Sequence, residues 1–203
     1  MAAKKSLRHA SGNTRDRILN IALELFVRNG FHGTSIDDIM SKVKMTKGAF
    51  YSHFEGKDDL FRNLVAGYRA SFLGGLRTCI DGLKGDSLEK IHHAISFLAR
   101  FAVQNTYQCV FLTFLTAELS ANANFEPALR RIYKDYQKII CKLINQGVKE
   151  GVLRDDLDPE LAALTFMALH DGVLHQWTLN RGSIGGEEFV RTFRQIFVRG
   201  VSR

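Results

Sequence analysis

A short run of polar residues around Phe50 and Phe54 carries side chains that could contact nucleic acid. The two aromatic residues are four positions apart, so they can bury one face of a two-turn helix while their neighbours face outward. Hydroxyl, imidazole and ammonium groups suit phosphate oxygens and base edges, and a glycine allows a backbone to approach closely. For the segment taken alone, the alternative is a solvated polar helix face. The outward-facing residues are Thr46, Lys47, Gly48, Tyr51, Ser52 and His53.

The residues in front of this run predict a helix that would position it. Thr34 or Ser35 can cap this helix, and Thr34 followed by Asp37 fits the capping-box pattern, in which two side chains satisfy free backbone N–H groups. Apolar residues then recur every three or four positions, which indicates one buried face: Ile36, Ile39, Met40 and Val43. Two short helices joined by a tight turn predict a helix-turn-helix over about residues 35–54.

From Thr14 to Leu60 the chain resembles the DNA-binding domain of the TetR family of bacterial repressors. The resemblance rests on the order and spacing of four segments: TRDRILNIALELF ending in Asn29-Gly30-Phe31, then Gly33-Thr34-Ser35-Ile36, then the run from Thr46 to Phe54, and finally Lys57-Asp58-Asp59-Leu60. It implies an N-terminal domain of three helices that binds double-stranded DNA. We predict phosphate contacts from Thr34, Tyr51, His53 and Lys57, and base-edge contacts from Thr46, Lys47 and Gly48 at the leading end of the recognition helix.

The distribution of charge agrees with a DNA-binding N-terminal region. The chain has a net charge of +7, and residues 1–57 hold ten Lys and Arg against five Asp and Glu, whereas residues 58–203 hold eighteen against sixteen. Such an excess supplies the salt-dependent part of DNA affinity that ignores sequence. We expect residues 1–11 to be a flexible basic tail, although Lys4, Lys5 and Arg8 could also touch phosphates.

Beyond the motif the apolar residues keep helical spacing, and no segment shows convincing strand alternation. The pattern predicts an all-α protein of about nine helices, with later helices over about 60–83, 87–105, 107–121, 126–150, 159–180 and 187–201. Asp158 followed by Pro159 fits a helix start, while Gly151 and Gly182 fit helix ends. Glycines at 67, 74 and 75 indicate either a bend in the long helix or close helix packing.

A length of 203 residues with 45% hydrophobic residues allows one large domain or two small ones. We predict the basic tail, a helix-turn-helix domain over 12–72, and a C-terminal effector-binding and dimerisation domain over 73–203. The middle helices are rich in aromatic residues, which with a few polar groups would suit an apolar or aromatic small molecule. Ordinary core packing is the alternative. The candidate pocket residues are Phe72, Phe97, Phe101, Gln104, Phe111, Phe114, His170 and Trp177.

The last two predicted helices carry stripes that could pair with their copies in a second chain. The resemblance implies a twofold homodimer formed by these helices. Its two recognition helices would lie about 34–36 Å apart and would bind a palindromic operator. The same stripes could instead belong to the core of one chain. The candidate interface residues are Leu161, Ala168, Gly172, Phe189, Phe193, Ile196 and Phe197.

Motifs for catalysis or for a cofactor are absent from the sequence. There is no GxSxG, no GxxxxGK[ST] and no GxGxxG after a strand, and His170 and His175 miss the i,i+4 spacing of a helical metal pair. No apolar run approaches the roughly 20 residues that span a membrane, and no signal-peptide core is present. Three cysteines without a CxxC pair suit a reducing compartment. We therefore predict no enzyme activity, no cofactor or metal, no membrane partner, and a cytoplasmic location.

Together these features predict a dimeric, ligand-responsive DNA-binding regulator, with repression as the expected action. Ligand binding would shift the long helix that follows Lys57 and so change the separation of the two recognition helices. Two alternatives stay open at this point. One is a helical carrier or enzyme with a basic N-terminal region, and the other is a DNA-binding regulator controlled by a protein partner.

Overall fold

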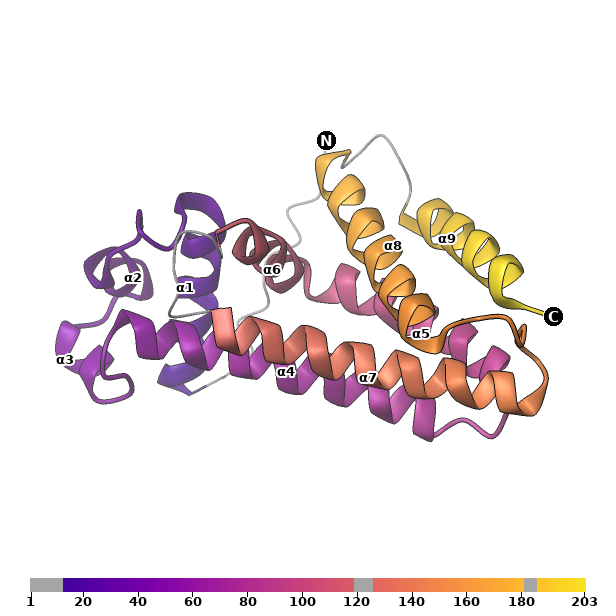
Figure 1. The fold of residues 1–203 in the computed structure, drawn as a ribbon. Coiled ribbons are helices and arrows are strands. Elements are labelled where there is room, and N and C mark those ends of the chain that lie inside the picture. Colours follow the sequence, from indigo (N-terminus) through magenta and orange to yellow (C-terminus); the bar gives the residue numbers. More distant parts are fainter. Residues whose placement is uncertain (1–12, 119–125, 181–185) are drawn as a thin grey trace. The chain divides into compact units, whose positions relative to one another are not determined.

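The computed structural model describes residues 13–118, 126–180 and 186–203, and for residues 113–118 it describes the backbone alone. The described residues form nine helices (Figure 1). Within these ranges the only pairing of strand type is an isolated antiparallel bridge between Leu153 and Ser202. The chain divides into two compact units, Met1–Leu64 and Val65–Arg203. The division falls earlier than the predicted limit at residue 72 and lies within helix α4.

The first unit contains helices α1 (Thr14–Asn29), α2 (Ile36–Val43), α3 (Lys47–Tyr51) and the beginning of α4 (Lys57–Asp81). The side chain of Asn13 caps the start of α1 by accepting a hydrogen bond from the Asp16 N–H. Gly30 ends α1 with a φ of 75°, a backbone conformation that favours glycine. The buried side chains of α1, α2 and α4 form one core: Ile18, Ala22, Phe26, Ile39, Met40, Leu60 and Phe61.

Helix α2 begins at a capping box that lies one residue later than the sequence pattern indicated. The Ser35 hydroxyl accepts from the Asp38 N–H, and the Asp38 carboxylate accepts from the Ser35 N–H at 2.8 Å. Hydrogen bonds from Ser35 lower the pKa of the Asp38 carboxyl. The prediction that Thr34 and Asp37 form the capping box is therefore wrong, although the predicted helix is present as α2.

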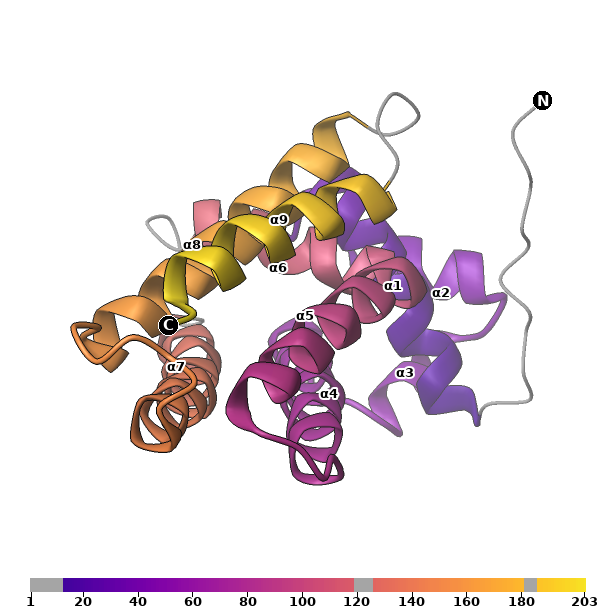
Figure 2. The same ribbon diagram turned by 90° about the vertical axis from the view of Figure 1, so that its right-hand side faces the viewer.

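The second unit consists of the rest of α4 with α5 (Ser87–Gln104), α6 (Thr106–Glu118), α7 (Glu126–Glu150), α8 (Pro159–Leu179) and α9 (Gly186–Val201). The Asp158 carboxylate caps α8 by accepting from two backbone N–H groups, and Pro159 follows in the first turn, as predicted. In this unit α8 and α9 lie side by side, α7 packs along α8, and α5 packs against α9 (Figure 2). The predicted helix end at Gly182 lies outside the described residues.

Aromatic side chains fill the space between α4, α5 and α7. The Phe72 ring lies 5.3 Å from the Phe101 ring and 5.1 Å from the Tyr136 ring, measured between ring centroids. Burial raises the pKa of Tyr136 well above its usual value, because the phenolate could not be hydrated there. A second aromatic cluster joins α8 to α9, where the Phe166 ring contacts the rings of Phe193 and Phe197.

The glycines of α4 differ in what they do for packing. A Cβ added at Gly75 would lie 2.7 Å from the Phe97 ring, so the absence of a side chain lets α5 approach α4 closely. A Cβ added at Gly67 or Gly74 would meet nothing within 4 Å. Close packing therefore explains Gly75 alone. No helix within the described residues is both long and apolar enough to cross a membrane.

Candidate nucleic-acid interface and ligand cavity

The turn between α2 and α3 is short and is set by one residue in a left-handed conformation. Lys44 has φ 61° and ψ 48°, and its N–H donates to the carbonyl oxygens of Met40 and Ser41 at the end of α2. Helix α3 has only five residues, which is too few for a stable isolated helix. Phe50, with no exposed surface, and Phe54, with 2% exposed, anchor it to the core of the first unit.

The outward face of this segment presents the side chains predicted for DNA contact. Thr46, Lys47, Gly48 and His53 are exposed, and Tyr51 has 58% of its surface exposed. Thr46 occupies the N-cap position of α3, but its hydroxyl makes no capping hydrogen bond. This leaves donors and acceptors on the surface that the fold does not require.

Gly48 lies in the middle of this face, although no described residue excludes a side chain there. A Cβ added at Gly48 would meet only the Thr46 hydroxyl oxygen, at 3.7 Å, which is an ordinary contact. Glycine also lowers the stability of a helix relative to alanine. The bare position is therefore not explained by the fold, and it is suited to close approach by a phosphate backbone.

Lys47 is held by a carboxylate that the sequence did not single out as part of this surface. Its ammonium nitrogen lies 2.8 Å from a carboxylate oxygen of Asp37 on α2, and both side chains are more than half exposed. The hydrogen bond with Asp37 raises the pKa of Lys47. Spacing alone could not reveal the pair, because the two residues are on different helices.

Two residues that were predicted to contact phosphates have structural roles in the first unit. Thr34 has only 1% of its surface exposed, and its hydroxyl donates to the Gly30 carbonyl at 2.9 Å. The prediction that this hydroxyl contacts a phosphate directly is therefore corrected. The Lys57 ammonium donates to the carbonyls of Phe31 and Thr34, both at 2.9 Å, and lies over the Phe31 ring. Lys57 therefore joins the start of α4 to the loop before α2.

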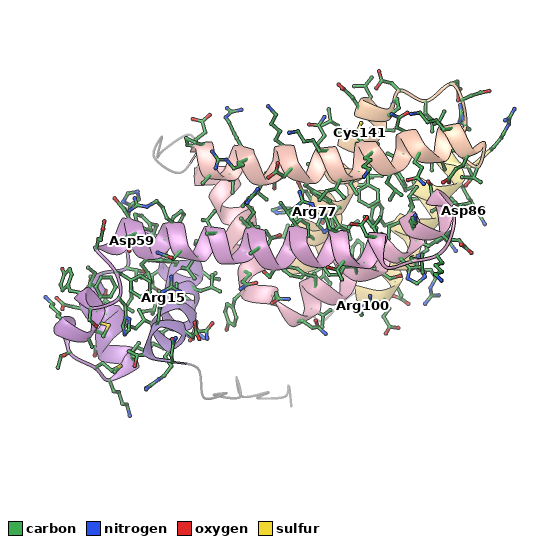
Figure 3. The ribbon with its side chains drawn as sticks, turned by 90° about the horizontal axis from the view of Figure 1, so that it is seen from below. Arg15, Asp59, Arg77, Asp86, Arg100 and Cys141 are labelled. Carbon is green, nitrogen blue, oxygen red and sulfur yellow. The ribbon has the colours of Figure 1, made fainter. Side chains whose placement is uncertain are left out.

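Contacts between α1 and α4 support the end of the recognition segment. The Arg15 guanidinium donates to the Asn63 side-chain oxygen and lies over the Phe54 ring, 5.4 Å from its centroid. The Asn63 amide donates in turn to the carbonyl and carboxylate oxygens of Asp59; Arg15 and Asp59 are labelled in Figure 3. Phe54 is thus covered by a cation that is itself fixed in place.

The second unit contains a cavity of about 610 Å³ between α5, α8 and α9. Three of the predicted pocket residues line it: Gln104, His170 and Trp177. The His170 ring is nearly parallel to the Phe72 ring, with 6.3 Å between centroids, so His170 separates the cavity from the aromatic core.

The other predicted pocket residues are placed elsewhere. Phe72, Phe101 and Phe111 are buried in the core, and Phe97 packs on Gly75; none of the four lines the cavity. The prediction is corrected for these residues, because the aromatic side chains fill the space between helices. The side chain of Phe114 lies outside the described residues.

Three arginines that the sequence analysis did not select also line the cavity. Arg100 is on α5 (labelled in Figure 3), and Arg191 and Arg194 are on α9. The Arg194 guanidinium donates to the Ser96 hydroxyl oxygen at 2.7 Å. The residues are distant in sequence and share no motif, so only the packing of α5 against α9 reveals the cluster.

The predicted dimer residues separate into an exposed face and a buried one. Leu161, Ala168 and Gly172 are exposed along α8, and Ile196 on α9 has 62% of its surface exposed. Phe193 and Phe197 are buried against Phe166 and form core within one chain, which corrects their assignment to the interface. Phe189 is half-buried and lines the cavity. Two further leucines of α8 are also exposed: Leu164 has 45% of its surface exposed and Leu179 has 66%.

Family models and known proteins agree with this architecture. Residues 18–64 match the family described as bacterial regulatory proteins, tetR family, and residues 84–201 match the tetracyclin repressor-like C-terminal domain. The HTH-type transcriptional repressor KstR2 of Rhodococcus jostii is 26% identical over 200 residues, covering 93% of this chain and 91% of KstR2.

Two solved structures show the same fold. The MbdR regulator of Azoarcus sp. CIB has a TM-score of 0.83 at 27% identity, covering 91% of this chain and 97% of MbdR. FadR of Bacillus subtilis, solved in complex with stearoyl-CoA, has a TM-score of 0.79 at 20% identity, covering 91% and 98%. Because the C-terminal match alone spans more than half of the residues, the chain belongs to the tetR family of bacterial regulatory proteins and is a DNA-binding transcriptional regulator.

Proposed function

We propose that this regulator is a repressor that binds a palindromic operator as a homodimer and leaves it when a small molecule occupies the cavity of the second unit. The observation that carries the DNA-binding part is the exposed face of Thr46, Lys47, Gly48 and Tyr51 on a helix anchored by Phe50. The polar groups of this face have no role in holding the fold, apart from the exposed pair of Lys47 with Asp37.

The base-reading role falls to Thr46, Lys47 and Gly48, and Tyr51 and His53 contact phosphates on either side. The first residues of a recognition helix lie deepest in the major groove, whereas residues one turn later reach the backbone. Lys57 acts through position, because its ammonium holds the loop that carries the N-terminus of α2. Repression as the action is supported by the similarity to KstR2, which is an HTH-type transcriptional repressor.

Dimerisation through α8 and α9 is supported by the exposed apolar side chains on their outer faces. Leu161, Leu164, Leu179 and Ile196 are each at least 45% exposed. Apolar side chains that gather on one face are typical of an interface. A Cβ added at Gly172 on the same face would meet nothing within 4 Å, which leaves room for a second helix.

A small-molecule effector is supported by the volume and lining of the cavity. About 610 Å³ lies within the range that binds small ligands, and most of the lining is apolar with a few polar groups. Release of the operator requires that the ligand bind the DNA-free conformation more tightly than the DNA-bound one.

Selection of operators from random duplex DNA tests the proposal, using wild type, Lys47→Ala and Tyr51→Phe. Wild type should enrich a palindromic site. Lys47→Ala should lose selectivity at particular bases, and Tyr51→Phe should weaken binding to every selected site about equally, because a phosphate contact carries no sequence information. Lys149→Ala is the matched control, since it removes an exposed lysine of the second unit. Failure of the wild type to enrich any palindrome would refute the proposal.

A further inference from the structure

The cavity of the second unit has a cationic lining, although most of its wall is apolar. Arg100, Arg191 and Arg194 line it together with one acidic residue, Glu187. Within the described part of the chain, none of the three arginines forms an ion pair with a carboxylate. Arg69 on α4 differs from them, because its guanidinium is paired with the Asp135 carboxylate.

Arg194 is the arginine that the fold fixes in place. The Ser96 hydroxyl donates to the His92 carbonyl at 2.9 Å, which leaves its oxygen to accept from Arg194 at 2.7 Å. The Nε atom of Arg194 is buried and has no hydrogen-bond partner among the described residues. The Arg194 guanidinium is therefore held at the cavity wall by a neutral partner, and the guanidinium still has N–H donors available for another acceptor.

The positive charge of Arg194 affects the pKa of a histidine on the neighbouring helix α5. The pKa of His92 on α5 is lowered, first by burial and then by the positive charge of Arg194. Arg100 and Arg191 are exposed, whereas Arg194 is half-buried. The cavity is therefore lined by two exposed cations and one half-buried cation.

The remaining wall suits an apolar group. Ile95, Leu98 and Leu174 each have less than 10% of their surface exposed, and each of them lines the cavity. Trp177 lines it as well, and it is the only tryptophan in the chain. An apolar body could lie along these side chains while an anionic group reaches the guanidinium.

We infer that the effector is an amphipathic anion, with an apolar body against α5 and α8 and a carboxylate or phosphate bound by Arg194. Arginine binds both of these groups through its planar fork of N–H donors, and the partly buried site strengthens the attraction. Arg100 and Arg191, which line the same cavity and are exposed, add to the attraction for the anion. This inference rests on the proposed regulatory function, and it names the chemical class of ligand that the cavity selects.

Fluorescence of Trp177 measures occupancy of the cavity directly. Octanoate and octyl phosphate are titrated into the DNA-free protein, with octanol as the uncharged control and octylamine as the cationic one. We expect at least one of the two anions to bind about ten-fold or more tightly than octanol, and octylamine to bind least. Comparing octanoate with octyl phosphate tells whether the anionic group is a carboxylate or a phosphate. Equal affinity for the anions and octanol would overturn the inference.

Variants test the role of Arg194. Arg194→Gln should abolish the preference for the anion, whereas Arg199→Gln, which removes an exposed arginine of α9 that does not line the cavity, should retain it. Full preference in a folded Arg194→Gln protein would also overturn the inference. If Arg194→Gln does not fold, Ser96→Ala removes the fixed partner and should reduce the preference several-fold.

These measurements separate the inference from the proposed function. They need no DNA, and operator selection needs no ligand. An anion preference without a selected palindrome would refute the regulator proposal and leave the ligand class standing. A selected palindrome without an anion preference would do the reverse.

Discussion

Basic side chains lie both on the exposed face of Thr46, Lys47, Gly48 and Tyr51, which we propose as the DNA-facing surface of the first unit, and in the cavity of the second unit, but their partners differ. Lys47 on the surface lies 2.8 Å from the Asp37 carboxylate, and water reaches both groups. Arg194 in the cavity donates to the neutral Ser96 hydroxyl. One cation already has a counter-ion, and the other has only a dipole.

The difference teaches what each region can recognise. An exposed lysine can exchange one oxygen partner for another at little cost, which suits reversible contact with many phosphates. A half-buried guanidinium is less well hydrated, so an anion of the right shape gains more from it. The surface is suited to scanning a polymer, and the cavity is suited to selecting one small molecule.

The largest expected effect concerns the anchor of the surface. Phe50→Ala should lower the free energy of unfolding by about 3–5 kcal/mol, because it leaves a cavity beneath α3. Tyr51→Ala, its exposed neighbour, should change stability by less than about 0.5 kcal/mol while weakening operator binding. Urea unfolding and DNA titration separate the two effects. A stable Phe50→Ala protein would show that burial does not hold the recognition helix.

Lys57→Met tests whether a cation of the first unit can be purely structural. The change removes donors to the carbonyls of Phe31 and Thr34 and the contact with the Phe31 ring. We expect a loss of about 2 kcal/mol in the free energy of unfolding, measured by urea denaturation. Lys44→Met, at an exposed position, serves as the control. If both variants unfold at the same urea concentration, the structural role assigned to Lys57 is wrong.

Two adjacent glycines of α4 test the packing of the second unit. Gly75→Ala should lower stability by about 1–3 kcal/mol, because the new Cβ would lie 2.7 Å from the Phe97 ring. Gly74→Ala meets nothing within 4 Å and should raise stability by up to about 1 kcal/mol. Thermal unfolding of the pair gives the comparison. Shifts of the same sign would contradict the close packing of α5 on α4.

The smallest effect sharpens the contrast between paired and unpaired cations. Asp37→Asn frees Lys47 from its counter-ion and should raise affinity for any duplex by roughly two- to five-fold at low salt. Asp81→Asn makes the same charge change at an exposed position of the second unit and should have little effect. Anisotropy titrations with unrelated duplexes measure this. No difference between the variants would mean that Asp37 does not compete for Lys47.

The first unit could be predicted closely because its signals are local. Helix starts, the glycine at position 30 and the stripe of Phe50 and Phe54 lie within a few residues of what they determine. The errors there come from neighbours that share a chemistry: Ser35 took the cap that Thr34 also fits, and Thr34 became buried.

For the second unit, the helices could be predicted from the sequence, but only three of the predicted pocket residues line the cavity: Gln104, His170 and Trp177. Phe193 and Phe197 lie on the apolar stripe that the sequence assigns to the dimer interface. In the structure this part of the stripe packs on Phe166 within the same chain. Aromatic residues indicated a pocket, but most of them fill the core. Arg100 and Arg194 meet only because α5 packs against α9, and no spacing along the chain records that contact.

Reciprocal binding of ligand and operator tests the central claim, that the cavity and the DNA-facing surface are coupled. The affinity of the better anion, octanoate or octyl phosphate, is measured from Trp177 fluorescence with and without saturating selected operator. The operator affinity is measured by anisotropy with and without that anion. We expect the anion and the operator each to weaken binding of the other by the same factor, about five-fold or more. Equal affinity of the anion for free and operator-bound protein would contradict it.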